Sequence, residues 1–353
     1  MTIRSIYQLL CKRLPSYGDD YLNNNVTIKD VAKASGVSTA TVSRVLRNKG
    51  YASNEIREKV LSTAKMLNYQ PNALARSLKN HQTHTIGVVI PDISNPYFMR
   101  ISRGIEDTVY QNGYNLIFAS AEEKPKKENE LLNLLFEKRV DAIVLATSGQ
   151  NEEIVNKIKN SRIPIVLVDR ELTEQNESID FVAEDNFNAA FELTNYLLSK
   201  GHTRIGVVNG PQTVSTGIER YNGFKKAIQE YGLEEDPDFI FNGNFNQEDG
   251  ENAVKNFFNR NNKPTAIISF NNTMSFGVLL QLTRMGYSLP RDVVLASYGE
   301  VEGAKLLKSP NIVYVSQSPY EMGVRVGEIL MNRLMNHSTE PVIEKFRPKI
   351  LIE

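Results

Sequence analysis

The sequence predicts two fold classes in one chain: a small all-α domain with a helix-turn-helix, followed by an α/β domain of two Rossmann-like lobes. Two observations predict this order. Residues 26–46 read as two short helices joined by a glycine turn. From Thr85 onward, apolar runs of strand length alternate with segments of helical periodicity. A length of 353 residues agrees with more than one domain.

Residues 1–25 fit poorly with the segment that follows them. They end in Asn23-Asn24-Asn25, which is typical of a flexible lead-in. We interpret them as a disordered or misannotated N-terminal extension. The alternative, suggested by Lys12 and Arg13, is an additional arm that contacts DNA together with residues 26–46.

Residues 26–46, VTIKDVAKASGVSTATVSRVL, predict the helix-turn-helix. Thr27 and Asp30 have the spacing of a capping box. Gly36 supplies the positive φ that the turn requires, and Ser38 caps the second helix. The expected buried positions are Ile28, Val31, Ala32, Val42, Val45 and Leu46. The outward positions are Thr39, Ala40, Thr41, Ser43 and Arg44, a hydroxyl-rich surface that suits a groove of bases and phosphates.

The alternative for this segment is an ordinary helical hairpin, because helix-turn-helix patterns give false positives. The charge distribution favours DNA binding. Residues 1–81 contain 13 Lys and Arg against 5 Asp and Glu, whereas the remaining residues contain 28 against 36. A basic module on an acidic body is typical of a nucleic-acid-binding protein, since each neutralised phosphate releases counterions.

A third helix and a hinge are expected next. Ser53 caps a helix with Ile56, Val60, Ala64 and Leu67 on one face, which completes a DNA-binding domain over residues 26–70. The sequence PNALARSL, Pro71–Leu78, then predicts a short helix within a hinge and linker over residues 71–82. Eight residues are too few for a stable isolated helix, so we expect it to form only against a partner helix and a DNA surface.

Residues 83–353 are expected to form the two-lobed domain. The predicted strands are 85–90, 115–120, 141–146, 164–169, 180–185, 204–210, 239–243, 265–270 and 292–298, with helices between them. This alternation indicates parallel sheets covered on both faces. Ligands of such sheets bind at the carboxyl ends of the strands, here Pro91-Asp92, Ala119-Ser120, Asp169-Arg170, Asn209-Gly210, Phe270-Asn271 and Tyr298-Gly299.

Composition and motifs argue against several other classes. The single cysteine, Cys11, excludes an internal disulfide framework and a cysteine-based zinc site, and we expect no metal and no cofactor. No run approaches the length of a transmembrane span or of a secretory signal, so we expect a cytoplasmic protein without membrane contact. The four histidines are scattered along the sequence, and no cluster of catalytic residue types is visible. We therefore expect that the protein is not an enzyme. Asp169, Glu184 and Asp185 are more simply hydrogen-bonding groups than an acid/base pair.

From residue 26 to the C-terminus the sequence resembles the LacI/GalR family of bacterial transcription regulators. The resemblance rests on TIKDVAKASGVSTATVSRVL, REKVL, LNYQPNALARSL, TIGVVIPDISNPYF, Asp185-Asn186, KGHTRIGVVNGP, ERYNGF, FNNTMSFG and Gln317. It implies a helix-turn-helix that reads the major groove, a hinge helix that enters the minor groove, and a body similar to periplasmic sugar-binding proteins that binds a small effector and dimerises.

The resemblance also implies roles for individual residues. The implied DNA-contacting positions are Thr27, Ser38, Thr39, Ala40, Thr41, Ser43, Arg44, Asn72, Ala75 and Leu78. Leu78 matches the family's wedge between base pairs, although a leucine that closes the hinge on the body is the alternative. The implied effector-binding positions are Tyr97, Phe98, Arg170, Thr216, Arg220, Asn272 and Gln317. Plain packing is an alternative for Tyr97 and Phe98. For Arg220 the alternative is a surface ion pair with Glu219 or a cation at a helix end.

Two departures from the family pattern bear on the effector. The usual Asn-Asp is Asn271-Asn272 here, and the usual Gly-Phe-Asp is Ser297-Tyr298-Gly299. Both remove negative charge while Arg170 and Arg220 remain, so we expect an acidic or phosphorylated sugar rather than a neutral one.

The sequence therefore predicts a sequence-specific DNA-binding repressor of a carbohydrate-utilisation operon, controlled by a sugar, sugar acid or sugar phosphate. We expect a homodimer on a pseudo-palindromic operator, and no tetramer, because no heptad-patterned tail follows VIEKFRPKILIE. A sugar-binding transport component without a DNA role is the alternative function, and an enzyme acting on sugars is a third.

Overall fold

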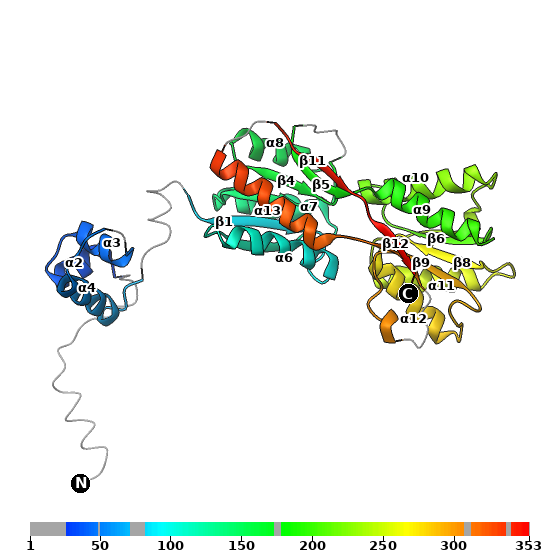
Figure 1. Ribbon diagram of the computed structural model, residues 1–353, viewed down its shortest axis with the longest axis horizontal. Helices are drawn as coiled ribbons and strands as arrows, with labels where there is room; N and C mark the ends of the chain where they lie inside the picture. The colour runs from blue at the N-terminus through cyan, green and yellow to red at the C-terminus, as the bar shows by residue number, and fades with distance from the viewer. Residues whose placement is uncertain are drawn as a thin grey trace, which may run out of the picture. The chain divides into compact units, whose positions relative to one another are not determined.

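The computed structural model describes residues 26–48, 50–70, 82–172, 178–306, 312–336 and 340–352. The chain divides into two compact units between His81 and Gln82, each of which is considered by itself (Figure 1). The N-terminal extension of residues 1–25 and the hinge helix of residues 71–78 lie outside the described residues.

The first unit contains the predicted helix-turn-helix and the third helix. They are α2 (Ile28–Ser35), α3 (Thr39–Leu46) and α4 (Asn54–Met66). Gly36 ends α2 in the left-handed region with φ 66°, as the turn requires. A small core of Val31, Ala32, Val42, Val45, Val60 and Ala64 joins the helices. The predicted buried faces are therefore confirmed, with Ile28, Leu46, Ile56 and Leu67 partly buried around that core.

The second unit is an α/β body of two lobes. The first lobe contains β1 (Thr85–Ile90), α6 (Pro96–Tyr110), β2 (Asn115–Ser120), α7 (Pro125–Glu137), β3 (Ala142–Leu145), α8 (Glu152–Asn160), β4 (Ile165–Val168), β5 (Asp180–Glu184), α13 (Pro319–Asn336) and β11 (Ile343–Phe346). The second lobe contains α9 (Asn186–Ser199), β6 (Ile205–Asn209), α10 (Ser215–Glu230), η3 (Pro237–Phe239), β7 (Ile240–Asn242), α11 (Gln247–Phe258), β8 (Ala266–Ser269), α12 (Asn272–Arg284), β9 (Val294–Tyr298), η4 (Ala304–Leu306), β10 (Val313–Ser316) and β12 (Lys349–Ile352).

Each lobe is built on one sheet. Over the described residues, the first sheet has six strands in the order β11-β5-β4-β3-β1-β2, and the second has six in the order β12-β10-β9-β8-β6-β7. The first sheet is parallel throughout, and in the second only β12 runs antiparallel to its neighbour. The chain passes between the lobes after β5, after β10 and after β11, so these crossings form the hinge of the body (Figure 1).

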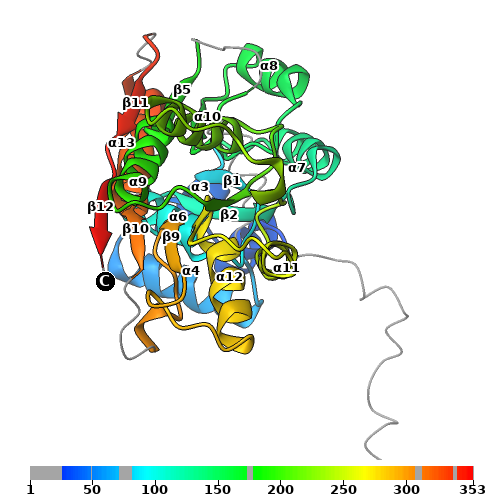
Figure 2. The ribbon, with the colours of Figure 1, turned by 90° about the vertical axis from the view of Figure 1, so that its right-hand side faces the viewer.

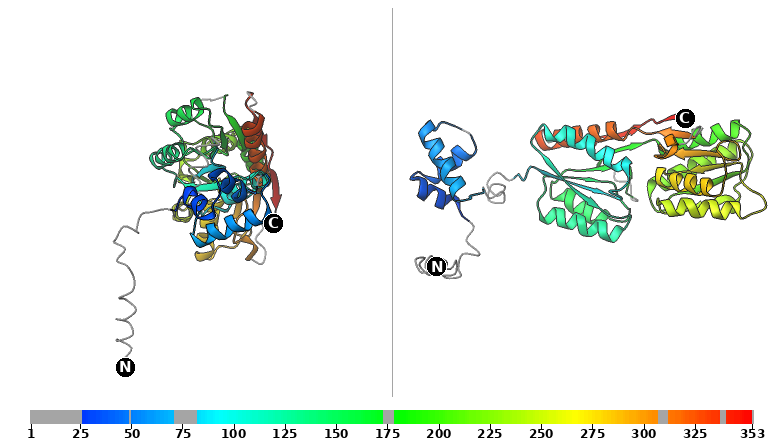
Figure 3. Two further views of the ribbon diagram at one scale, coloured as in Figure 1. Left: turned by 90° about the vertical axis from the view of Figure 1, so that its left-hand side faces the viewer. Right: turned by 90° about the horizontal axis from the view of Figure 1, so that it is seen from below.

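Helices cover both faces of each sheet, as the apolar strands require. In the first lobe, α6 and α13 lie on one face and α7 and α8 on the other (Figure 3). In the second lobe, α9 and α10 lie on one face and α11 and α12 on the other (Figure 2). Gly104 and Gly323 let α6 and α13 approach closely, because a Cβ at Gly104 would lie 2.2 Å from the carbonyl oxygen of Tyr320.

The predicted architecture is confirmed, and the predicted strands agree with the observed ones to within two residues at each end. The antiparallel β12 is a feature that the alternation of strands and helices did not predict. It forms because the last segment pairs along β10, with Val313 opposite Ile352 and Ser316 opposite Lys349.

Candidate functional site

The exposed face of α3 is the candidate DNA-contacting surface. Ser38, Thr39, Ala40 and Arg44 are exposed, while Thr41 and Ser43 are half-buried. The Ser38 side chain accepts a hydrogen bond from the Thr41 backbone N–H at 3.1 Å and caps the helix. The face is therefore positioned by the cap on one side and by buried Val42 and Val45 on the other.

Thr27 serves the other helix of the motif. Its backbone N–H and its hydroxyl donate to Oδ2 of Asp30 at 2.8 and 2.7 Å, and these two bonds lower the pKa of Asp30. Thr27 is exposed at the start of α2, so a cap role and a DNA contact are compatible there. The other predicted DNA contacts, Asn72, Ala75 and Leu78, lie outside the described residues.

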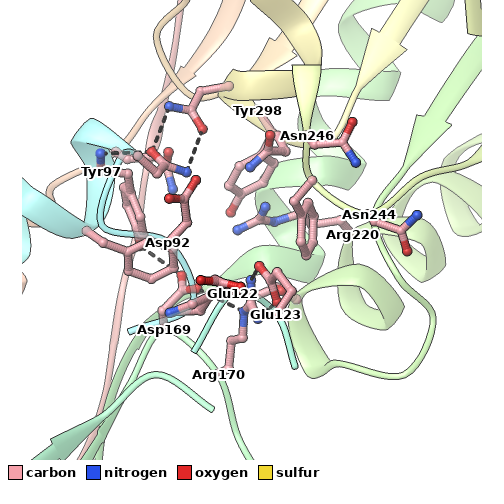
Figure 4. A pocket seen from close by; sticks show the side chains of 18 residues that line it. Asp92, Tyr97, Glu122, Glu123, Asp169, Arg170, Arg220, Asn244, Asn246 and Tyr298 are labelled. Atoms are coloured by element: carbon pink, nitrogen blue, oxygen red, sulfur yellow. Dashed lines mark hydrogen bonds and ion pairs between the residues drawn. The ribbon is translucent and has the colours of Figure 1, made fainter. Parts of the chain in front are cut away.

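The body contains a cleft of about 340 Å³ between the two lobes (Figure 4). It lies at the carboxyl ends of the strands, where the sequence predicted a ligand site. All seven predicted effector-binding residues line it, namely Tyr97, Phe98, Arg170, Thr216, Arg220, Asn272 and Gln317. The cleft thereby brings together residues up to 226 positions apart in the chain, since Pro91 and Gln317 both line it.

The first-lobe wall holds two aromatic side chains from the start of α6. The hydroxyl of Tyr97 donates to Oδ1 of Asp169 at 2.9 Å, and burial together with this carboxylate raises the pKa of Tyr97. Phe98 meets Tyr97 edge to face with ring centroids 5.3 Å apart. Both rings are buried in the lobe, and both residues line the cleft. Packing in the lobe and contact with a ligand are therefore compatible.

Arg170 is held by its own lobe. Its Nη1 and Nη2 donate to the two carboxylate oxygens of Glu123 at 2.6 and 2.7 Å, a bidentate ion pair. Nη1 also lies 3.3 Å from the carbonyl oxygen of Thr147. The guanidinium is flanked by Phe98 and Phe245, at 5.9 and 5.1 Å from the ring centroids. Counting Arg170 as a cation free to bind an anion was therefore wrong, because Glu123 neutralises it.

Arg220 projects from α10 into the cleft, as Figure 4 shows. Its Nε donates to Oδ1 of Asn186 and its Nη1 to the carbonyl oxygen of Phe270, both at 2.8 Å. Its Cζ lies 3.8 Å from the centroid of the Tyr298 ring. These contacts fix the plane of the guanidinium, and its burial rules out the alternative of a surface ion pair.

Glu184 is a buried carboxyl group beside the cleft, at the point where β5 crosses to the second lobe. It accepts hydrogen bonds from Nε2 of Gln317 at 2.9 Å and from the backbone N–H of Ser318 at 3.0 Å. Burial raises the pKa of Glu184 to about 7, against the lowering effect of these bonds and of Arg220. The carboxyl group therefore links two of the three crossings between the lobes.

Several lining residues were not predicted. They are Asn95, Glu122, Glu123, Asn244, Phe245 and Asn246. The strand-end rule contained the signal for most of them, because Glu122 and Glu123 follow β2 closely and Asn244, Phe245 and Asn246 follow β7.

Gly299, where the family usually has an aspartate, lies in a backbone conformation that favours glycine. Its φ is 98°, and an added Cβ would lie 2.6 Å from Oε1 of Gln317 and 3.2 Å from Cβ of Asn272. A side chain at this position would be strained and would collide with the cleft wall.

The described lining is more acidic than the predicted residues implied. It includes Asp92, Glu122, Glu123 and Asp169 against Arg170 and Arg220. Carboxylates accept, guanidinium groups donate, and carboxamides do both, so the cleft can form paired hydrogen bonds with neighbouring hydroxyl groups. The described residues contain no group of three or more histidines, cysteines or carboxylates that could hold a metal ion, and no described helix could cross a membrane.

Comparisons with known proteins match the two units of the chain separately. Residues 27–72 match the profile described as bacterial regulatory proteins, lacI family, and residues 83–345 match that of periplasmic binding proteins and sugar binding domain of LacI family. The chain is 32% identical over 327 residues to the HTH-type transcriptional repressor PurR of Histophilus somni (strain 129Pt), covering 92% of the chain and 97% of that protein. PurR of Pasteurella multocida (strain Pm70) matches equally well, with the same identity and coverage.

Solved structures show the same fold. A complex of the transcriptional regulator CelR with cellobiose matches with a TM-score of 0.70 and 25% identity, over 92% of this chain and 98% of that one. A LacI family protein from Silicibacter pomeroyi matches with a TM-score of 0.77 and 25% identity, over 93% and 98%. The Lac repressor dimer bound to operator and the anti-inducer ONPF reaches 0.78 at 20% identity, over 93% and 98%, which supports the fold alone.

Proposed function

The chain belongs to the LacI family of bacterial regulatory proteins, and from this premise we propose that a sugar bound in the cleft of its body controls repression at operator DNA. As a member of this family it is a DNA-binding transcriptional repressor and not an enzyme. A transport component without a DNA role is thereby set aside, because the helix-turn-helix matches the family as well as the body does.

The composition of the cleft wall is the observation that carries the proposal. Planar polar side chains, among them Asp92, Arg220 and Asn246, surround a cavity that aromatic residues also line. A sugar offers what such a wall recognises: vicinal hydroxyls for paired hydrogen bonds and an apolar ring face for an aromatic side chain. The similar regulator CelR was solved with cellobiose, which supports the same ligand class here.

We propose an uncharged sugar in place of the anionic one that the sequence favoured. Glu123 neutralises Arg170, and Lys124 and Lys127 pair with Glu122. The two other lining carboxylates, Asp92 and Asp169, then outnumber the one other lining guanidinium, that of Arg220. Desolvating an anion against this surplus of carboxylates would be unfavourable. A sugar acid or sugar phosphate stays as the competing class, and it would need Arg220 as its main contact.

The DNA side of the proposal rests on α3 and on the hinge. Thr39, Ala40 and Arg44 would contact bases and backbone in the major groove, with Ser38 and Thr41 at phosphates near the helix N-terminus. Leu78 would act as the minor-groove wedge. A homodimer would present two such helices to a pseudo-palindromic operator.

Two measurements test this function. Selection of binding sites from a random-sequence DNA library with the full chain should return a pseudo-palindromic duplex. A thermal-shift screen of neutral sugars, sugar acids and sugar phosphates, followed by calorimetry, should identify a neutral sugar that binds the body. Tight binding of sugar acids or phosphates alone would contradict the proposed ligand class, and binding of no member of the screen would contradict the sugar proposal itself.

A further inference from the structure

The carboxylate of Asp141 holds the first residues of the body. Its Oδ1 accepts from the backbone N–H and from the hydroxyl of Thr83 at 2.8 and 2.9 Å. Its Oδ2 accepts from the backbone N–H groups of Thr83 and His84 at 3.1 and 2.8 Å. These are the first residues of the body, so one side chain fixes the backbone that leads into β1.

The same residues are held from the other side by the start of β2. The carbonyl oxygen of His84 accepts from the backbone N–H of Asn115 at 3.0 Å. The ring of His84 lies 5.3 Å from that of Tyr114. His84 has φ 51°, a conformation unusual for a residue other than glycine that persists only where its surroundings enforce it. Thr83, His84, Tyr114 and Asp141 therefore form what we call the linker clamp.

Two strands connect the linker clamp to the cleft. β1 begins directly after His84 and leads into Pro91 and Asp92 of the cleft wall. β3 begins directly after Asp141 and leads to Thr147, whose carbonyl oxygen lies 3.3 Å from Nη1 of Arg170. The two strands are hydrogen-bonded neighbours in parallel register. A strand of six residues spans about 20 Å, so two adjacent, buried, stiff elements run between the clamp and the ligand site.

The hydrogen bonds of the Asp141 side chain all go to Thr83 and His84, the first residues of the body after the linker. β3 is held by backbone pairing with β1 and β4, which needs no carboxylate. The backbone N–H of Asp141 donates to the carbonyl oxygen of Thr85 at 2.8 Å, and this bond would survive a change of side chain. The fold of the lobe and the hold on the linker are therefore separable by substitution at this position.

We propose that Asp141 is a positioning residue that makes the linker move with the first lobe, and thereby couples the cleft to the DNA-binding unit. A movement of the first lobe changes operator binding only if the linker follows it, because coupling requires an element whose arrangement both sites bias. The proposal rests on the proposed function, since it names the residue through which the effector site acts on the DNA site.

The test uses the full chain, the selected operator duplex as the probe and hydrogen exchange as the readout. Coupling is reciprocal, so operator binding should change amide exchange in the cleft segments 91–98 and 147–151 of the unsubstituted protein. In Asp141→Asn, which keeps the shape but replaces an acceptor oxygen by a donor, the duplex should still bind. The change in exchange at the cleft should then be lost, and the amides of Thr83 and His84 should exchange faster.

Two further variants keep the test decisive. Thr83→Val removes the hydrogen bond from the Thr83 hydroxyl to Asp141 and leaves the Asp141 carboxylate in place, so it should lose part of the coupling even if Asp141→Asn does not fold. Asp238→Asn makes the same chemical change at an exposed ion pair with Arg260 in the second lobe and should behave as the unsubstituted protein. An exchange response at the cleft that is equal in all variants, or absent from the unsubstituted protein, would overturn the proposal. Failure of the sugar screen would instead count against the proposed function.

Discussion

Asn95 and Asn272 bind each other across the cleft through their carboxamides. Nδ2 of Asn95 lies 3.4 Å from Oδ1 of Asn272, and Nδ2 of Asn272 lies 3.2 Å from Oδ1 of Asn95. The orientation of Asn95 is set by its role as helix cap, because its Oδ1 accepts from the backbone N–H of Tyr97 at 3.0 Å. Asn272 must therefore donate to that oxygen, which an aspartate could not do. The departure from the family's usual aspartate thus has a role between the lobes.

We predict that Asn272→Asp weakens binding of every ligand, neutral sugars included. The substitution removes one hydrogen bond and places a carboxylate against Oδ1 of Asn95, at a cost of about 1–3 kcal/mol, or roughly 5- to 150-fold in affinity. Calorimetry with a neutral sugar measures the loss. Asn95→Ser should have a smaller effect, since serine keeps the cap of α6 and removes only the contact between the lobes. Unchanged affinity for neutral sugars in Asn272→Asp would show that the contact between Asn95 and Asn272 does not support ligand binding.

Arg220→Lys should weaken ligand binding by about one to two decades although the charge is kept. Lysine cannot donate to Asn186 and Phe270 in fixed directions while its head stays stacked on Tyr298, so the donor aimed at the ligand is no longer positioned. The affinity is measured by calorimetry, and circular dichroism confirms the fold. Equal affinity in the two proteins would remove Arg220 from the ligand site.

The stability of the body should fall as pH rises through the window from 4.5 to about 7. Burial raises the pKa of Glu184 to about 7 in the folded protein from 4.5, so within this window the folded state keeps a proton that the unfolded chain has released. The stability present below the window is lost across it, on the order of 3 kcal/mol, and stays constant above it. Melting temperatures from pH 4.5 to 8 should show this slope, and Glu184→Gln should reduce it. The same slope in both proteins would assign the titration to another group.

Arg44→Ala should lower operator affinity without changing the melting temperature of the protein. Arg44 is exposed at the end of α3 and outside the core of the first unit, so its removal leaves the packing intact. A lost base or phosphate contact costs roughly 1–3 kcal/mol. Fluorescence anisotropy with the selected duplex measures it, and a change in affinity below twofold would argue against α3 as the reading helix.

The sequence was most informative where a local pattern has one structural solution. The alternation of strands and helices placed Asp92, Arg170 and Tyr298 at the carboxyl ends of strands, and all three line the cleft. Tyr97 and Arg220, which also line it, were implied by the family resemblance. The capping box and Gly36 predicted the turn of the first unit for the same reason. These features depend on residues within a few positions of one another, which a sequence shows directly.

Contacts between residues far apart in the chain could not be predicted from the sequence. Glu123 pairs with Arg170 from 47 positions away, and this pairing is the reason that we propose an uncharged ligand instead of an anionic one. Glu122 and Glu123 both have φ near 55°. A glycine or asparagine at these positions would have predicted this left-handed conformation, but a glutamate does not. The pairing of Asn95 with Asn272 could not be predicted either, since it depends on how the two lobes meet.

The most direct test of control by a cleft ligand is the operator dissociation constant with and without a saturating sugar. Saturation of the cleft is verified by calorimetry on the same sample, and operator binding is followed by fluorescence anisotropy at fixed salt, because phosphate contacts make the affinity salt-dependent. We predict that the sugar changes the operator dissociation constant by about 5–150-fold, and that Arg220→Lys needs more sugar for the same change. An operator dissociation constant that stays the same when the cleft is demonstrably filled would contradict ligand control of this repressor.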